Sequence, residues 1–371
     1  MGYCDRCRRE YSPDGIVIPW SLIDADPDAA MLSLYVQGYT KTVPAIAADV
    51  LDLDHGKWVA KATDLLDESG DRALVADPEE CARLHVTEPE PLWQRRLRLQ
   101  QARWRQANGY PEGHTRSGRP LGSRLEASFA AETWANFLTP ASATRARHEL
   151  TTTVGVMEET RMLTNLLSSQ PLCFNLFAEL DTDPDHRLAT AWARRLWPQR
   201  VQRVTAIRFE YSPGRGVADY LDNRSAFDVF IEYEHRDGGH GFVGVEVKYH
   251  ENLSRAKSND VRQRALDVAA ASSAFVDPAS ARLTGLPLSQ LFLDHLLALS
   301  MLERDGWRHG LFVLLYPRDN KSCADAITSY QEQLAEADTF ESLTLEAAIG
   351  HLQALTQAQW VRTLWDRYVP S

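Results

Sequence analysis

Residues 226–251, AFDVFIEYEHRDGGHGFVGVEVKYHE, are the stretch from which the fold can be predicted. The segments 226–233 and 242–249 are rich in apolar, aromatic and β-branched side chains, which is typical of β-strands. Between them, the Asp-Gly-Gly sequence at 237–239 supplies residues that tolerate a positive φ, as tight turns require. The sequence therefore predicts a β-hairpin.

Polar residues in this hairpin fall on one face of the second strand. Side chains alternate between the faces of a strand, so Gly244, Glu246 and Lys248 share one face while valines occupy the other. Asp228 opens the first strand, and pairing of the two strands would bring it near Glu246 and Lys248. Two carboxylates and one ammonium group are thus expected at one spot.

This combination suits hydrolysis of a phosphodiester with a divalent metal ion. Carboxylate oxygens hold Mg²⁺ while leaving water positions open. The bound ion polarises the phosphoryl oxygen and lowers the pKa of an attacking water, and a nearby lysine orients that water or offsets charge on the phosphate. The alternative is a solvated hairpin face with a cross-strand ion pair. Strands apolar enough for burial on both faces favour the functional interpretation.

The composition is that of a soluble globular protein. The chain is 44% hydrophobic and 25% charged. Its length of 371 residues is enough for one large or two ordinary domains. No apolar run approaches the length of a membrane span, and the first residues, MGYCDRCRRE, lack the apolar core of a signal peptide. Five cysteines form too sparse and odd a set for a disulfide framework. We therefore expect a cytoplasmic protein.

The net charge of −11 belongs to the first part of the chain. Residues 1–92 hold 18 acidic and 8 basic residues, whereas the rest of the chain holds 33 acidic and 32 basic residues. We predict a small acidic N-terminal module at 1–92, for which a partner protein is one candidate ligand. The acidic bias does not count against nucleic-acid binding by residues 93–371.

Cys4 and Cys7 form a Cys-x-x-Cys pair, which is half of a zinc site. No second pair follows at a usual spacing, so His55, Cys81 or His85 would have to complete the site. The sequence leaves open whether Zn²⁺ binds at Cys4 and Cys7 or whether the pair is incidental.

Residues 93–120 form a basic segment whose only acid is Glu112. Apolar residues at helical spacing predict a helix in its first half, which Gly109 and Pro111 end. Two interpretations are evenly matched. One is an arm that binds nucleic-acid phosphates, and the other is a solvated basic helix that docks on the acidic N-terminal module. The arginines of the predicted arm include Arg98, Arg103 and Arg105.

The order of the predicted elements indicates an α/β core with a mixed sheet. GLFVLLY at 310–316 is apolar throughout, as in strands buried on both faces. In chain order we expect helices at 121–167 and 172–180, a strand at 201–211, the hairpin, a helical insertion at 252–289, a helix at 288–303, the strand at 310–316 and closing helices at 339–368.

Two acids in the predicted helices have candidate roles. Ser123 and Glu126 resemble a capping box at a helix start. Glu179 shares a helix face with Leu172 and Leu176. A carboxylate on such an apolar stripe either reaches solvent at the helix end or points into the metal site.

Together, these residues and their order resemble the PD-(D/E)xK nuclease superfamily. Its α-β-β-β-α-β core carries Asp on the second strand and Glu-x-Lys on the third, where Asp228, Glu246 and Lys248 fall. More narrowly, SSQPLCFNLFAEL at 168–180, FDVFIEY, VEVKYHE and LFVLLYP resemble a bacterial family described as restriction endonucleases. The resemblance covers residues 93–371, with a catalytic core at about 160–320, and does not extend to 1–92.

The resemblance implies a restriction-endonuclease-like fold and a set of site residues. Asp228, Glu246 and the carbonyl of Val247 would ligate Mg²⁺ or Mn²⁺, and Lys248 would position the attacking hydroxide. Phe227 stands where the motif has proline, which is not a ligand, so the chemistry should be unaffected.

Two further residues match positions that only some members of the superfamily use. Glu179 matches the extra acid of the first helix, and Gln290 matches a polar residue on the helix after the Glu-x-Lys strand.

The expected function is that of a Mg-dependent endonuclease that hydrolyses DNA phosphodiester bonds, as a restriction or antiphage-defence effector. The alternative is a catalytically silent nuclease-fold protein that binds nucleic acid or a partner protein. The sequence contains no Walker-type phosphate-binding loop, so any ATP-driven step would need a partner. Cutting both strands commonly needs two active sites, which makes a homodimer a candidate assembly.

Overall fold

The computed structural model describes residues 2–4, 9–11, 78–86, 90–152, 158–255 and 261–370. The chain divides into two compact units, Met1–Arg103 and Trp104–Pro370. The division falls inside helix α6 (Leu92–Ala107), whose first residue lies at the predicted domain boundary. Each unit is considered by itself below.

The first unit contains a short hairpin and a helix-based cluster. Strands β1 (Gly2–Cys4) and β2 (Arg9–Tyr11) pair antiparallel. Helix α5 (Pro78–Arg83) precedes α6. A small apolar cluster joins the α5 region to α6 and consists of Cys81, Leu84, Val86, Leu99 and Ala102.

The zinc site predicted at Cys4 and Cys7 involves side chains outside the described residues, as does its candidate ligand His55. Of the other two candidates, Cys81 is buried in the apolar cluster and His85 is exposed. Binding of Zn²⁺ at Cys4 and Cys7 therefore stays a prediction.

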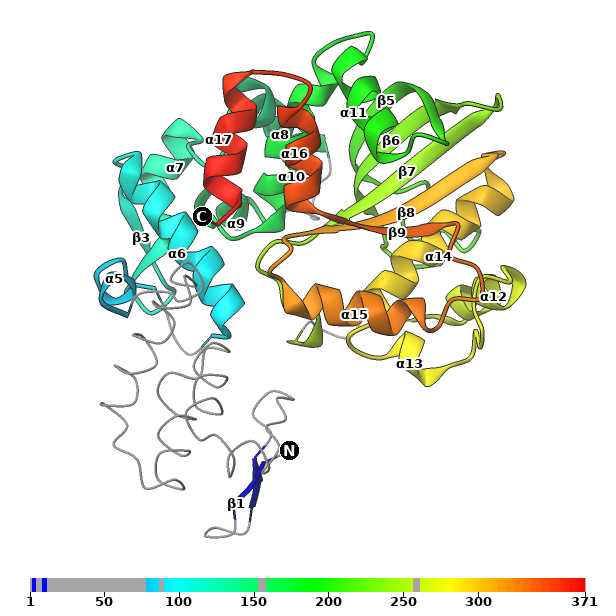
Figure 1. Ribbon diagram of the computed structural model, residues 1–371, viewed down its shortest axis with the longest axis horizontal. Coiled ribbons are helices and arrows are strands. Elements are labelled where there is room, and N and C mark those ends of the chain that lie inside the picture. The colour runs from blue at the N-terminus through cyan, green and yellow to red at the C-terminus, as the bar shows by residue number, and fades with distance from the viewer. Residues whose placement is uncertain are drawn as a thin grey trace. The chain divides into compact units, whose positions relative to one another are not determined.

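A five-stranded sheet forms the centre of the second unit, in the order β5-β6-β7-β8-β9 (Figure 1). β6 runs antiparallel to both β5 and β7, whereas β8 runs parallel to β7 and β9 parallel to β8. The predicted mixed sheet is confirmed. The strands are β5 (Val201–Tyr211), β6 (Phe227–His235), β7 (His240–Val247), β8 (His309–Tyr316) and β9 (Phe340–Thr344).

The predicted hairpin corresponds to β6 and β7. Phe230 pairs with Gly244 across the two strands, and the turn contains Gly238 at φ +84° and Gly239 at φ +91°. Those angles belong to the left-handed region that glycine adopts without steric cost. Gly244 serves packing instead, because a Cβ there would lie 2.6 Å from the ring of Phe227.

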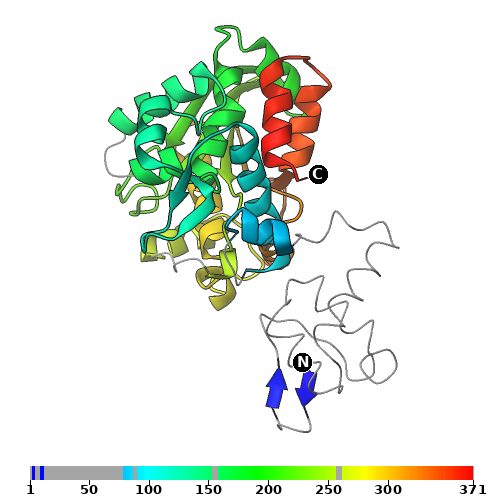
Figure 2. The same ribbon diagram turned by 90° about the vertical axis from the view of Figure 1, so that its left-hand side faces the viewer.

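Helices cover both faces of this sheet (Figure 1). On one side, α14 (Ser289–Arg304) packs on β8 together with α12 (Gln263–Ala271), α13 (Ala281–Thr284) and α15 (Lys321–Gln331). On the other side lie α10 (Ser169–Phe177), α11 (Arg187–Leu196), α16 (Leu345–Gln353) and α17 (Gln359–Tyr368). The last two helices lie side by side in both views (Figure 1, Figure 2).

Burial of aromatic rings holds the α14 side of the sheet together. Phe230 and Phe242 stack with ring centroids 5.2 Å apart, and Trp307 packs edge-on against both. Phe312 lies in the same apolar core as the inner face of α14. Within the described part of the chain, no helix is both long and apolar enough to cross a membrane.

The helical prediction for 121–167 is wrong at its start. Residues 121–125 belong to the second strand of an antiparallel pair, and three helices follow within the predicted range. Gly118, at φ +80°, lies in the turn that returns the chain from the first strand to the second. The elements are β3 (Glu112–His114), β4 (Pro120–Leu125), α7 (Ala127–Thr133), α8 (Pro140–Thr152) and α9 (Glu159–Thr164).

The capping box predicted at Ser123 and Glu126 is wrong for the same reason. Ser123 is buried within β4. Glu126 is itself the N-cap of α7, and its carboxylate accepts hydrogen bonds from the backbone of Ser128 and Phe129. An acid can cap a helix directly, because its oxygens accept from the first unpaired N–H groups.

The closing region predicted as helical contains one more strand, β9. This strand is five residues long, and its Phe340 is buried beside β8. Thr344 ends the strand and caps α16, since its hydroxyl accepts from the N–H of Ala347. A strand this short gives too few alternations for a period to be read from the sequence.

Candidate active site

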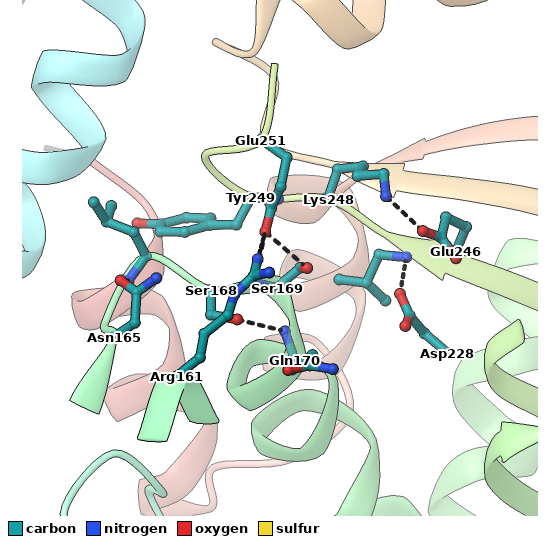
Figure 3. A network of polar contacts seen from close by, with 12 residues as sticks. Arg161, Asn165, Ser168, Ser169, Gln170, Asp228, Glu246, Lys248, Tyr249 and Glu251 are labelled. Atoms are coloured by element: carbon teal, nitrogen blue, oxygen red, sulfur yellow. Dashed lines mark hydrogen bonds and ion pairs between the residues drawn. The ribbon is translucent and has the colours of Figure 1, made fainter. Parts of the chain in front are cut away.

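The predicted site lies where β6 begins and β7 ends. Val229 pairs with Val245 in the antiparallel register, so Asp228 and Glu246 are the next residues along the two strands. Lys248 follows directly after β7. The hairpin thus brings the three motif residues to one end of the central sheet, and Figure 3 shows their side chains in this region.

Hydrogen bonds connect the motif residues. The Asp228 carboxylate accepts from the backbone N–H of Val247 at 2.7 Å (Figure 3). Lys248 Nζ lies 2.5 Å from Glu246 Oε1. Gln290, on α14, donates to the same oxygen at 2.6 Å. The structure therefore brings Gln290 into the site that the sequence predicted from resemblance.

The site is buried and carries more negative than positive charge. Burial raises the pKa of Asp228 well above its ordinary value, and the negative charges of Glu246 and Glu210 raise it further. Burial and the charge of Glu246 also raise the pKa of Glu210 to about 7. Buried carboxylates with raised pKa values are typical of sites that gather like charges for a function.

Lys248 stays protonated in this environment. Burial by itself lowers its pKa, but the carboxylates of Glu246, Asp228 and Glu251 outweigh burial and raise the pKa above that of an ordinary lysine. A lysine with a raised pKa acts as a fixed positive charge and hydrogen-bond donor rather than as a base.

Sequence reasoning missed Glu210, which lies near the end of β5. Its backbone adopts a left-handed φ of +48°, and Arg215 lies 3.6 Å from its carboxylate. Glu149, on α8, is also buried, and its negative charge adds to the raised pKa of Glu210. Neither acid belongs to a local motif, so no spacing in the sequence marked them.

Sequence reasoning also missed Asp294, although a signal for it exists. This residue interrupts an otherwise apolar helix and follows Gln290 by four positions, which places both on one face of α14. Asp294 is 4% exposed, and within the described part of the chain its Oδ2 has no hydrogen-bond partner. Burial and the charge of Glu246 raise its pKa well above the ordinary value.

Glu179 lies outside the regular helix in which it was predicted. Helix α10 ends at Phe177, and Glu179 belongs to the following 3₁₀ turn, η3 (Ala178–Asp181). The tighter turn changes the spacing that placed Glu179 beside Leu176. The charges that dominate the pKa of Asp228 are those of Glu246, Glu210 and Lys248. A role for Glu179 as an extra acid stays a prediction.

Glu251 anchors the segment that follows the motif lysine. It accepts hydrogen bonds from the N–H of Tyr249 at 2.8 Å and from both the N–H and the hydroxyl of Ser169, and it pairs with Arg161 at 3.1 Å (Figure 3). Burial raises its pKa, but the charge of Lys248 and these hydrogen bonds lower it overall. The contacts tie the start of α10 to the end of β7.

The three arginines predicted to bind nucleic acid have partners within their own units. Arg98 donates to Glu90 at 2.8 Å, and Arg103 donates to Glu80 at 2.9 Å. Arg105 is buried and donates to the carbonyls of Gly122 and Tyr110. These contacts accord with the basic helix docking on acidic residues, and phosphate binding by these arginines stays a prediction.

The carboxylates fit a divalent cation. Asp228, Glu246 and Glu210 supply hard oxygen donors, and their mutual repulsion is the kind that a cation removes. Oε1 of Glu246 accepts from Lys248 and Gln290, which makes its second oxygen the candidate ligand. Val247 is buried beside Asp228, where its carbonyl was predicted to bind the ion.

The family model for the PD-(D/E)XK nuclease superfamily matches residues 88–370. This range is more than half of the chain, so the chain belongs to that superfamily, as the sequence analysis predicted. The mixed five-stranded sheet agrees with the superfamily fold. No curated protein and no solved structure matches the chain.

Proposed function

We propose that this chain is a metal-dependent endonuclease that hydrolyses DNA phosphodiester bonds. The observation that carries the proposal is the placement of Asp228, Glu246 and Lys248 at one end of the sheet in a member of a nuclease superfamily, with Asp228 bound by the N–H of Val247 and Lys248 bound to Glu246. Resemblance of the segments around this set to restriction endonucleases supports a role in restriction or antiphage defence.

Asp228, Glu246 and the carbonyl of Val247 would hold Mg²⁺ or Mn²⁺. When bound, such an ion polarises the phosphate and makes water a stronger nucleophile near neutral pH. Asp228 is fixed for this task, because the N–H of Val247 holds one of its carboxylate oxygens. Gln290 fixes the Glu246 carboxylate in the same way.

Lys248 provides positive charge at the site of attack. Its ammonium group stays protonated and is held against Glu246, so it can donate a hydrogen bond to the attacking water or to a phosphate oxygen. Either contact stabilises negative charge that develops as the phosphodiester reacts. The proton released by the attacking water does not go to Lys248, because that group is already protonated.

Cleavage of supercoiled plasmid DNA by the purified full chain tests this function. The reaction is run with Mg²⁺, with Mn²⁺ or with EDTA, and with the variants Asp228→Asn and Asp325→Asn. The matched control, Asp325, is an exposed aspartate on α15. We expect nicked or linear DNA with either metal, none with EDTA or Asp228→Asn, and normal cleavage by Asp325→Asn.

Metal-independent cleavage, or equal cleavage by Asp228→Asn and the parent, would contradict the proposal. Retention of DNA in a gel shift without any cleavage would instead favour a nuclease-fold protein that binds nucleic acid and does not cut it.

A further inference from the structure

A second cluster of ligand-bearing side chains lies at the opposite end of β7. His235 is the last residue of β6, Asp237 lies in the turn, and His309 is the first residue of β8. From His240 to Glu246 the strand rises about 3.3 Å per residue, so about 20 Å of strand separates this end from the active site. The two clusters cannot share an ion.

The three side chains meet at one carboxylate oxygen. Oδ1 of Asp237 lies 2.6 Å from Nδ1 of His235 and 3.0 Å from Nε2 of His309. The two imidazole rings stack with centroids 3.6 Å apart and an angle of 13° between their planes. All three ligand atoms lie within 4.8 Å of one another.

The fold positions these residues through backbone contacts. The N–H of His235 donates to the carbonyl of Gly239, which closes the turn. Gly241 pairs with His309 in the parallel register of β7 and β8, and the N–H of Arg308 donates to the carbonyl of His240. The cluster therefore joins three neighbouring strands at the point where the β6–β7 turn meets the start of β8.

The electrostatic environment favours uptake of a cation. One carboxylate oxygen faces a nitrogen of each of two imidazoles, and a neutral imidazole has one ring nitrogen that can accept a cation. The imidazoles are 12% and 19% exposed, whereas Asp237 is half exposed and leaves a path for an ion.

We propose that His235, Asp237 and His309 form a transition-metal site of the Zn²⁺ class that clamps the turn to β8. Two imidazoles and one carboxylate suit Zn²⁺, whereas Mg²⁺ prefers oxygen ligands alone. Bonds of about 2.0–2.1 Å in a tetrahedral site place ligand atoms about 3.4 Å apart. Oδ1 of Asp237 would have to move about 0.8 Å farther from Nδ1 of His235 and about 0.4 Å farther from Nε2 of His309, and the stacked rings would have to turn so that both nitrogens point at the ion. Water would take the fourth position.

Metal titration of the full chain tests the proposal. The parent for this experiment carries Cys4→Ser, Cys7→Ser and Asp228→Asn, which removes candidate ligands at the other two sites. Co²⁺ is added to the metal-free protein and its visible absorption is followed, and Zn²⁺ then displaces it. We expect one equivalent of ion to bind.

Three variants locate the ion. His309→Ala is expected to abolish binding, and Asp237→Asn, which keeps the size of the side chain, is expected to weaken binding at least tenfold. His240→Ala is the matched control, because this histidine is exposed at the start of β7, next to the turn, and lies outside the cluster. It should bind like the parent.

Thermal unfolding of the same proteins separates loss of the site from loss of the fold. Without metal, His309→Ala is expected to unfold as cooperatively as the parent, by circular dichroism. Because a ligand that binds only the folded state stabilises it, Zn²⁺ should raise the Tm of the parent and of His240→Ala but not that of His309→Ala. A parent that binds no ion, or a His309→Ala protein that binds as well as the parent, would overturn the proposal.

Discussion

The two ends of β7 carry polar clusters of opposite electrostatic character. At the end near Glu246, burial and neighbouring carboxylates raise the pKa of Asp228 well above its ordinary value. At the turn end, desolvation also raises the pKa of Asp237, but the hydrogen bond to His235 and the charge of His309 lower that pKa overall. Both aspartates belong to the same hairpin, Asp228 to its first strand and Asp237 to its turn.

The difference shows how burial changes what a carboxylate can do. Asp237 is half exposed, so water and two histidines stabilise the negative charge of its carboxylate. Asp228 is half-buried beside Glu246 and Glu210, and these three acids outnumber the cations Lys248 and Arg215. Like charges gathered in a buried place are costly unless a counter-charge joins them. Substitutions at each end of the strand should therefore have different effects.

The largest effect is expected for Lys248→Met. This change keeps the length of the side chain and removes the positive charge beside Glu246. We expect cleavage of plasmid DNA with Mg²⁺ to fall on the order of 1,000-fold, which is the scale of losing an electrostatic contact to developing charge. Lys321→Met, at an exposed position of α15, is the control and should cleave normally.

Lys248→Arg sharpens this test, because it restores the charge without the compact ammonium geometry. Circular dichroism must first show that both Lys248 variants fold, since removing one partner of a buried ion pair destabilises a protein. Folded Lys248→Met that cleaves as fast as the parent would contradict the assigned role.

The next effect concerns the stability of metal-free protein at different pH values. The pKa of Glu210 is raised from 4.5 to about 7 on folding, so the folded state binds more protons than the unfolded state between these values. Stability is therefore predicted to fall as pH rises through this window, by about 3 kcal/mol at most for this one group. Tm values measured in EDTA from pH 5 to pH 8 check the sign.

Glu210→Gln should flatten that pH profile, and saturating Mg²⁺ should flatten it in the parent. Glu303→Gln is the control, since Glu303 is exposed on α14. Stability that instead rises with pH in the parent and is unchanged by Glu210→Gln would show that the repulsion among the buried acids is not a cost to folding.

A smaller effect is expected for Gln290→Ala. The side chain of Gln290 donates to Glu246 and touches no motif residue that we assign to the attack itself. Losing one hydrogen bond to a charged group costs about 1.5–3 kcal/mol, which corresponds to a fall in cleavage of roughly 10- to 100-fold. Gln290→Glu should not restore activity, because it adds another negative charge. Equal rates for Gln290→Ala and the parent would argue against this supporting role.

The sequence was sufficient to predict the part of the site that is local. Asp228, Glu246 and Lys248 lie on one hairpin, and strand alternation with a two-glycine turn predicts their arrangement. Gln290 came from resemblance alone, and the structure places it 2.6 Å from Glu246. The mixed sheet could be predicted from the order of elements, because each long strand has a clear pattern in the sequence.

The sequence was insufficient where distant elements meet. Glu210 reaches the site because β5 pairs with β6. A single acid near a strand end does not indicate that pairing in the sequence. Asp294 becomes significant only once α14 packs beside β7 and β8. β4 was mistaken for helix because it pairs with the short strand β3 and, at Arg124, with Asn165 farther along the chain, and strand pairing overrides local propensity.

The smallest effect on cleavage is expected at the turn end of β7. Asp237→Asn should leave the rate within about twofold of the parent, because about 20 Å of strand separates Asp237 from Glu246.

One cleavage measurement, with a variant at each end of β7, tests whether the active site lies at the Glu246 end. Supercoiled plasmid is incubated with the parent, Glu246→Gln or Asp237→Asn in Mg²⁺, and with the parent in EDTA. We predict cleavage by the parent and Asp237→Asn, and none by Glu246→Gln or in EDTA. Cleavage by Glu246→Gln at the rate of the parent would contradict the placement of the active site at this end of β7.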